Sequence, residues 1–348
     1  MFYRFSKYLI IFIFVTALYA DENYDAGISE LENSNHDKAI KFLELSAHAK
    51  NLDAYRVLGD IHYFESFPGT SIEEAEKWYR NLARSGSNYG AFMLALVWYE
   101  NPSFERDNIE ILRQFEQAAD LGSPDAEFML GLIFKEGNIA PKDLVRARNL
   151  FEKVVRDSPD LYSKYLLAEI YFELGEYSAS NDLLLGIIKN EHDLYSDPLF
   201  LADIHILSGR NYVSLVDLEA AEENFLQAKK LLEPIEEGSW QLATTLNYLS
   251  LNYLTKGQLT LAEKFSLKAI KQRPDDGVAY NNFGIILSER GENGMAKNYF
   301  SKSLELLEAE FGAEHMELTP TLNSLGLASS ELEEFAEAEE YYTKFLVM

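Results

Sequence analysis

The sequence contains no cysteine among its 348 residues. This absence excludes disulfides, thiolate metal sites, thiol nucleophiles and a lipid-modified cysteine anchor. Basic residues are also few: 31 lysines and arginines stand against 57 aspartates and glutamates, which gives a formal net charge of −26. A charge of this sign and size repels phosphate backbones and anionic lipid surfaces. Nucleic acid is therefore not expected as a partner.

Long hydrophobic runs are missing except at the N-terminus. There Arg4 and Lys7 precede an apolar run over 8–20, and polar sequence begins at Asp21. This order is that of a secretory signal peptide, with cleavage predicted after Ala20. The alternative is an uncleaved membrane anchor, but the run is shorter than the roughly 20 residues needed to span a bilayer. We therefore expect export to the periplasm or the exterior, and no stable membrane insertion after cleavage.

The rest of the chain is apolar enough to fold, with 47% hydrophobic and 13% aromatic residues. A short motif recurs five times from residue 54: a small residue, a large apolar residue four later, then Gly or Ala, then an aromatic residue or His. The copies begin at residues 54, 91, 126, 163 and 197, so the step is 37, 35, 37 and 34 residues. A near-constant step in this range predicts an all-α, right-handed α-solenoid of stacked helical hairpins.

The motif and the helix that follows it, as in Ala54-Leu58-Gly59-His62 and then Ala75-Trp78-Tyr79-Leu82, resemble the Sel1-like repeat over about 54–192. A helical pair at about 24–32 and 36–50 is expected to cap this array. From about 193 the copies Leu246-Leu249-Tyr253-Gly257-Ala262 and Tyr280-Phe283-Gly284-Gly291-Ala296 resemble the 34-residue tetratricopeptide repeat. The last copy is similar to kinesin light chain repeats. The expected organisation is signal peptide 1–20, cap and Sel1-like repeats 21–192, and tetratricopeptide repeats 193–348.

Catalytic motifs are missing. The sequence has no HExxH, no G-x-S-x-G, no Ser-x-x-Lys and no Gly-Lys pair. His62 and His205 occupy the aromatic position of the repeat, which favours packing over metal binding, and His315 is expected to cap or pack. Acidic runs such as Glu73-Glu74-Glu76 are interpreted as solvated helix faces in preference to paired acid–base sites. We expect no enzymatic activity, no cofactor and no metal.

The resemblance to tetratricopeptide repeats implies a groove lined by the first helix of each pair. The fifth position of that helix is Asn247, Asn281 and Asn323 in three successive repeats, whereas the upstream repeat has Ile206. An asparagine offers a donor and an acceptor, which match the N–H and C=O of an extended peptide. These three are the predicted peptide-binding residues, expected to be solvated in the free protein. The alternative is that they stabilise helix packing.

The sequence ends inside or just after a second helix, so we expect Tyr342, Phe345, Leu346 and Val347 to lack a covering helix. Self-association or partner contact through Tyr342, Phe345 and Leu346 is predicted. The function expected from all these features is a scaffold that binds protein or extended peptide partners. A regulator of cell-wall or exopolysaccharide machinery in the envelope is the alternative.

Overall fold

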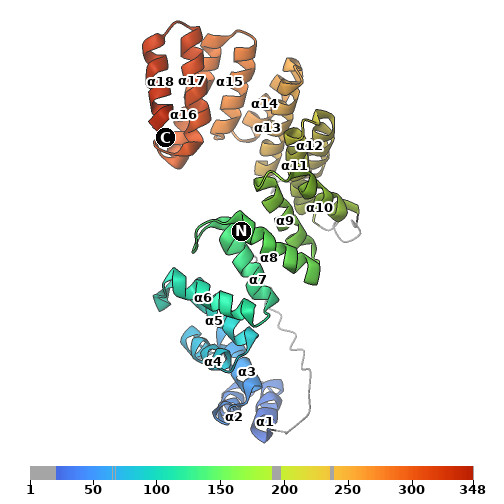
Figure 1. Cartoon of the computed structure of the whole chain (residues 1–348), viewed down its shortest axis with the longest axis vertical. Coiled ribbons are helices and arrows are strands. Elements are labelled where there is room, and N and C mark those ends of the chain that lie inside the picture. Colours follow the sequence, from blue (N-terminus) through green and yellow to red (C-terminus); the bar gives the residue numbers. More distant parts are fainter. Residues whose placement is uncertain (1–20, 65, 67, 190–196, 236–238, 348) are drawn as a thin grey trace. The chain divides into compact units, whose positions relative to one another are not determined.

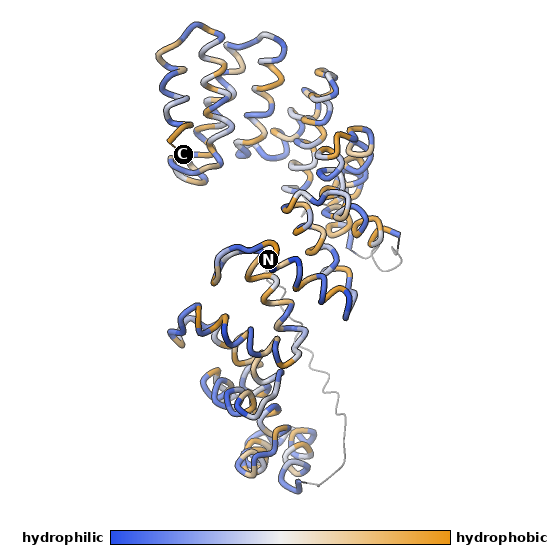
Figure 2. Tube along the Cα trace, viewed as in Figure 1, coloured by the Kyte–Doolittle hydropathy of each residue, from blue (hydrophilic) through white to orange (hydrophobic). Residues whose placement is uncertain are grey.

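The computed structural model describes residues 21–64, 66, 68–189, 197–235 and 239–347 (Figure 1). The predicted signal peptide, 1–20, lies outside the described residues. Within them every regular element is a helix, which confirms the predicted fold class. None of these helices combines the length and apolar character needed to cross a bilayer. Figure 2 shows apolar and polar residues interleaved along the helices.

The helices have the following bounds. They are α1 (Glu22–Glu32), α2 (His36–His48), α3 (Leu52–Tyr63), α4 (Ile72–Arg84), α5 (Asn88–Glu100), α6 (Asn108–Asp120), α7 (Pro124–Glu136), α8 (Leu144–Asp157), α9 (Leu161–Glu173), α10 (Tyr177–Lys189), α11 (Pro198–Ser214), α12 (Leu218–Leu232), α13 (Ser239–Thr255), α14 (Leu259–Gln272), α15 (Gly277–Glu289), α16 (Asn293–Phe311), α17 (Thr319–Glu331) and α18 (Phe335–Val347). Two short 3₁₀-helices, η1 (Pro102–Phe104) and η4 (Met316–Leu318), precede α6 and α17.

The chain divides into two compact units, residues 1–150 and 151–348, and the division falls within α8. The predicted change of repeat type near residue 193 lies inside the second unit. In both units consecutive helices pack as hairpins (Figure 1). In the second unit the first helices of neighbouring hairpins also contact one another, α11 with α13, α13 with α15 and α15 with α17. The helices predicted at about 24–32 and 36–50 are present as the hairpin of α1 and α2, and their role as a cap stays a prediction.

A glycine in the first helix lets the second helix approach closely. A Cβ built at Gly59, Gly209 or Gly326 would lie 2.5 to 2.6 Å from a ring carbon of Tyr79, Phe225 or Tyr342, respectively. Gly284 meets Phe300 in the same way. Tyr79 and Phe225 are fully buried. In these four hairpins a glycine of the first helix therefore provides the space, a glycine seat, for an aromatic ring of the second helix.

The turn between the two helices of a hairpin requires a left-handed residue. Gly175, Gly257 and Gly291 take this place with φ between 71° and 77°. After α11 the same place is taken by Val216, at φ 63° and 79% exposed. A β-branched side chain is rare in this region of φ because its methyl groups crowd the backbone. This turn is consequently strained where the glycine turns are not.

The glycine seats predict a stability difference between two otherwise similar substitutions. Gly209→Ala places a methyl group against the buried ring of Phe225 and lowers the free energy of unfolding by about 1 to 2 kcal/mol. Gly294→Ala is the control, because a Cβ at Gly294 would have no neighbour within 4 Å. It leaves stability unchanged or raises it by up to about 1 kcal/mol. Urea denaturation followed by circular dichroism measures both, and equal effects would contradict the role assigned to Gly209.

Candidate functional site

The predicted peptide-binding asparagines lie on the three consecutive first helices α13, α15 and α17. Asn247 and Asn281 are buried, with 6% and 7% of their surface exposed, whereas Asn323 is exposed. The expectation that all three are solvated is therefore wrong for Asn247 and Asn281. The physical reason is that neighbouring first helices pack against each other and cover the side chains between them.

Burial leaves both buried asparagines incompletely bonded. The Nδ2 of Asn247 donates to Asp276 Oδ2 at 3.2 Å. Asp276 is the N-cap of α15, and its other oxygen accepts from the backbone N–H groups of Val278 and Ala279. The Oδ1 atoms of Asn247 and Asn281 have no hydrogen-bond partner within the described chain. A buried carbonyl oxygen without a donor costs about 1 to 3 kcal/mol. Both oxygens are also shielded from solvent, so a bound N–H group could donate to them only after the side chains that cover them move.

The upstream first helices continue this face without asparagine. Ile206 of α11, at the position equivalent to Asn247, packs against the apolar core of the second unit. Asp203 of the same helix is partly buried, and the sequence did not single it out. Desolvation raises the pKa of Asp203 to about 6, and the nearby charges of Glu169 and Asp197 add to the shift. Glu169 is 34 positions away on α9, so no local pattern signals this pairing.

Two of the histidines considered above, His62 and His315, have structural roles. His62 is buried, and its Nδ1 accepts from the backbone N–H of Ser71, the N-cap of α4. His315 caps η4 by accepting from the N–H of Glu317, and its ring stacks on Phe311. Both agree with the prediction that these rings pack or cap. No group of three or more His, Asp or Glu side chains among the described residues is arranged to hold a metal ion.

The surface predicted for self-association is only partly open. Tyr342 is half-buried on Gly326, and Phe345 packs against the cluster of Leu307, Leu318 and Leu322. Leu346 is 79% exposed, and its neighbour Val347 is 83% exposed. The two aromatic rings are thus covered by their own hairpin and by the turn before it. Self-association through this end stays a prediction, and it would depend on Leu346.

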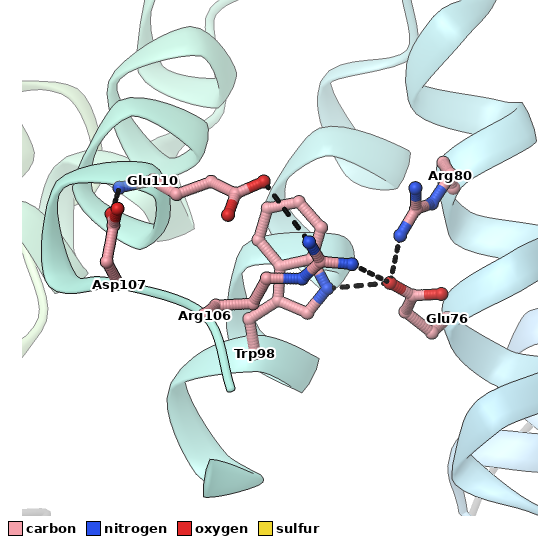
Figure 3. A network of polar contacts seen from close by, with 6 residues as sticks. All are labelled: Glu76, Arg80, Trp98, Arg106, Asp107 and Glu110. Carbon is pink, nitrogen blue, oxygen red and sulfur yellow. Dashed lines mark hydrogen bonds and ion pairs between the residues drawn. The ribbon is translucent and has the colours of Figure 1, made fainter. Parts of the chain in front are cut away.

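A polar network that the sequence did not reveal lies in the first unit (Figure 3). The Oε1 of Glu76 accepts from Arg80, from Trp98 Nε1 at 2.9 Å and from Arg106 at 3.4 Å. Burial would raise the pKa of Glu76, but the bonds from Trp98 and Arg80 and the charges of Arg80 and Arg106 outweigh it and hold the pKa low. The run Glu73-Glu74-Glu76 is therefore not uniformly solvated. The network could not be predicted from the sequence because Trp98 and Arg106 lie 22 and 30 positions from Glu76.

The raised pKa of Asp203 predicts a pH-dependent stability. A carboxyl whose pKa is higher in the folded than in the unfolded chain stabilises the fold when protonated, below the ordinary pKa of 3.8. That contribution is lost as the pH rises through about 6. Asp203→Asn should therefore raise the free energy of unfolding at pH 7 by about 1 kcal/mol, allowing for solvent screening of a partly exposed group.

The measurement is urea denaturation of both chains between pH 4 and 7. The difference between variant and parent should shrink toward pH 4. Asp182→Asn is the control, because Asp182 is exposed on α10. If the difference in free energy of unfolding stays constant across this range, the pKa of Asp203 is not raised by folding and the prediction is wrong.

Comparison with known proteins agrees with this architecture. Residues 275–346 match the tetratricopeptide repeat family. The human cell division cycle protein 16 homolog is 31% identical over 104 residues, which are 29% of this chain and 16% of that protein. The mitochondrial tetratricopeptide repeat protein 19 homolog of Drosophila melanogaster is 26% identical over 187 residues, which are 45% of this chain and 51% of that protein. The matches thus span about half or less of these curated relatives.

Two solved structures are similar over larger shares of the chain. One is c5321, a protective antigen of uropathogenic Escherichia coli with an SLR fold, with a TM-score of 0.50, 18% identity and coverage of 93% of this chain and 75% of that one. The other is PilW, a type IV pilus biogenesis factor, with a TM-score of 0.50, 18% identity and coverage of 64% and 91%. These likenesses concern the fold. The described chain has the architecture of tetratricopeptide and Sel1-like repeat proteins.

Proposed function

We propose that the protein is a non-enzymatic scaffold that binds an extended segment of a partner polypeptide along the first helices α13, α15 and α17. The observation that carries the proposal is the pair of buried Oδ1 atoms of Asn247 and Asn281 without a donor. An exposed asparagine, Asn323, occupies the equivalent position on the next helix. The tetratricopeptide pattern over the last two of these hairpins supports a partner of this kind, since such repeats serve as platforms for other proteins.

The geometry favours a main chain as the ligand. Asparagines at the same position of successive hairpins repeat one donor and one acceptor, whereas side-chain recognition requires a different pocket at each step. Asp276 fixes the amide of Asn247 through Nδ2, so its Oδ1 is held as an acceptor. Because this oxygen is buried, a peptide N–H reaches it only when the covering side chains move aside, and the N–H then satisfies a group that the free protein leaves unpaired. Binding would thus be accompanied by the relief of a folding cost.

The asparagines can be tested with peptides selected from a random library on the purified chain. Asn323→Ala removes an exposed side chain and should lower peptide affinity about 2-fold to 10-fold, with no loss of stability. The triple variant with Asn247→Ala and Asn281→Ala should lower it roughly 30-fold to 1000-fold. It should also lose some stability, because the Oδ2 of Asp276 then lacks the bond from Asn247. Fluorescence anisotropy gives the affinities, and thermal denaturation gives the stabilities.

Asn282→Ala is the matched control. Asn282 is a buried asparagine on the same helix as Asn281 but points from a different side of it. Its removal should leave peptide affinity within about 2-fold of the parent. Selection that yields no binding peptide, or a folded triple variant that binds as well as the parent, would overturn the proposal. The asparagines would then be packing residues.

We also propose that the protein is exported and that its mature chain begins at Asp21. In support, Asp21 is the N-cap of α1 and so belongs to the first helical hairpin. Its Oδ1 accepts from the backbone N–H groups of Asn23 and Tyr24, and its Oδ2 accepts from Asn51 and Ser46. These bonds hold the pKa of Asp21 below its usual value, with the Ser46 bond as the largest cause.

Intact-mass measurement of the protein from its native source tests the export proposal. The expected mass is that of residues 21–348, and the expected location is the periplasm or the medium. An intact mass that includes Met1, found in a cytoplasmic fraction, would refute it. The peptide-binding proposal would be unaffected by that outcome.

A further inference from the structure

A small pocket lies in the first unit, on elements that the proposed peptide site does not use. Its volume is about 150 Å³. Helices α4 and α6, the second helices of consecutive hairpins, both pack on α5 and form its walls. Its lining consists of Arg80, Ala83 and Arg84 from α4, Leu94 and Trp98 from α5, and Gln114 and Gln117 from α6.

The pocket contains N–H groups that do not donate to any acceptor among the described residues. Arg84 is exposed in the last turn of α4, and no described residue forms an ion pair or hydrogen bond with its guanidinium. Arg80 uses one terminal nitrogen to bind Glu76, which leaves N–H groups over because a guanidinium has five. The Nε2 of Gln114 donates to Gln117 Oε1 at 3.3 Å, so the Nε2 of Gln117 remains a donor. An acceptor is thus the complementary ligand.

The local charge is positive even though the chain is strongly acidic. Glu76, behind the pocket, is already shared by Arg80, Arg106 and Trp98. Arg106 also pairs with Glu110 at 3.5 Å, and its guanidinium lies 4.9 Å from the centre of the Trp98 ring (Figure 3). These groups neutralise one another, which leaves the charge of Arg84 uncompensated. The chain as a whole has a net charge of −26 and repels anions, so an anion can bind only where a positive charge such as that of Arg84 dominates locally.

The size and walls of the pocket distinguish between anions. A volume of about 150 Å³ is room for a carboxylate and its methylene groups. Ala83, Leu94 and the Trp98 ring supply apolar surface on which such methylenes pack. A phosphate carries more negative charge, so the acidic chain repels it more strongly. It also has no methylene groups that could pack on the apolar walls. A guanidinium fork also matches the planar geometry of a carboxylate.

We propose that this pocket binds the carboxylate of an acidic side chain, with glutamate as the best fit, on a partner polypeptide. Arg84 supplies the charge and the fork, the two glutamines supply amide contacts, and Trp98 supplies the floor on which the side chain rests. This goes beyond the proposed peptide site, because it lies on other helices and recognises a side chain. Either site can fail its test while the other passes.

The Trp98 indole N–H is the reporter for the test, because the chain has three tryptophans and thus three indole signals. Trp98→Phe assigns the signal in the nitrogen-15 spectrum of the purified protein. Titration with the capped peptide acetyl-Ala-Glu-Ala-amide should shift this signal to saturation, whereas acetyl-Ala-Gln-Ala-amide should not. Arg84→Gln should lower the affinity for the glutamate peptide by about tenfold, as expected for lost charge-assisted hydrogen bonds.

Arg113→Gln is the matched control, since Arg113 is an exposed arginine of α6 that does not line the pocket. It removes the same charge and should leave the titration unchanged. A separate titration with inorganic phosphate tests the choice of anion. Equal shifts from the glutamine peptide, equal binding by Arg84→Gln and the parent, or tighter binding of phosphate than of the glutamate peptide would each overturn the proposal.

Discussion

Four hairpins of this protein share one close contact, in which an aromatic ring of the second helix packs directly on a glycine of the first. At Gly59, Gly209, Gly284 and Gly326 no space remains for a methyl group. The distance between the two helices is set by this contact, and the distance decides which side chains on the remaining faces touch the next hairpin. Contacts between neighbouring hairpins then add polar bonds, such as those of Asn247 with Asp276 and of Trp98 with Glu76.

Polar side chains between hairpins complete the stacking. Asn211 of α11 donates to Ser180 and to Asn181 of α10, at 2.8 and 3.1 Å, and all three are buried. Ser180 in turn donates to the backbone oxygen of Ala168 on α9. Such buried networks are stable only when nearly every member is bonded. Asn211 Oδ1 and Asn181 Nδ2 nonetheless lack a partner among the described residues, as do the Oδ1 atoms of Asn247 and Asn281. What distinguishes Asn247 and Asn281 is their equivalent position on the successive first helices α13 and α15.

The fold could be predicted from the sequence because the repeat step and the small residue of the motif both reflect contacts inside one hairpin. Ala54 with Leu58 and Gly59, for example, are close in the chain, and their pattern alone predicts the helix and its buried face. The candidate sites were harder to predict from the sequence. The position of Asn281 in its repeat could be read, but its burial depends on the packing of α13 and α17 on α15. Glu76 looked like a member of a solvated run because its partner Arg106 follows a turn and a whole helix later.

The glycine seats also bear on how the chain folds. Phe225 follows Gly209, and Phe300 follows Gly284, by only 16 positions, so the contact that closes a hairpin forms between residues near in the chain. Contacts of low sequence separation need little loop closure and form quickly. Each hairpin can therefore serve as a nucleus, and structure can spread from it to its neighbours on either side. A chain of this kind has no unique starting point for folding. A destabilising substitution in one hairpin should therefore slow the folding of the adjacent hairpins without preventing the rest of the chain from folding.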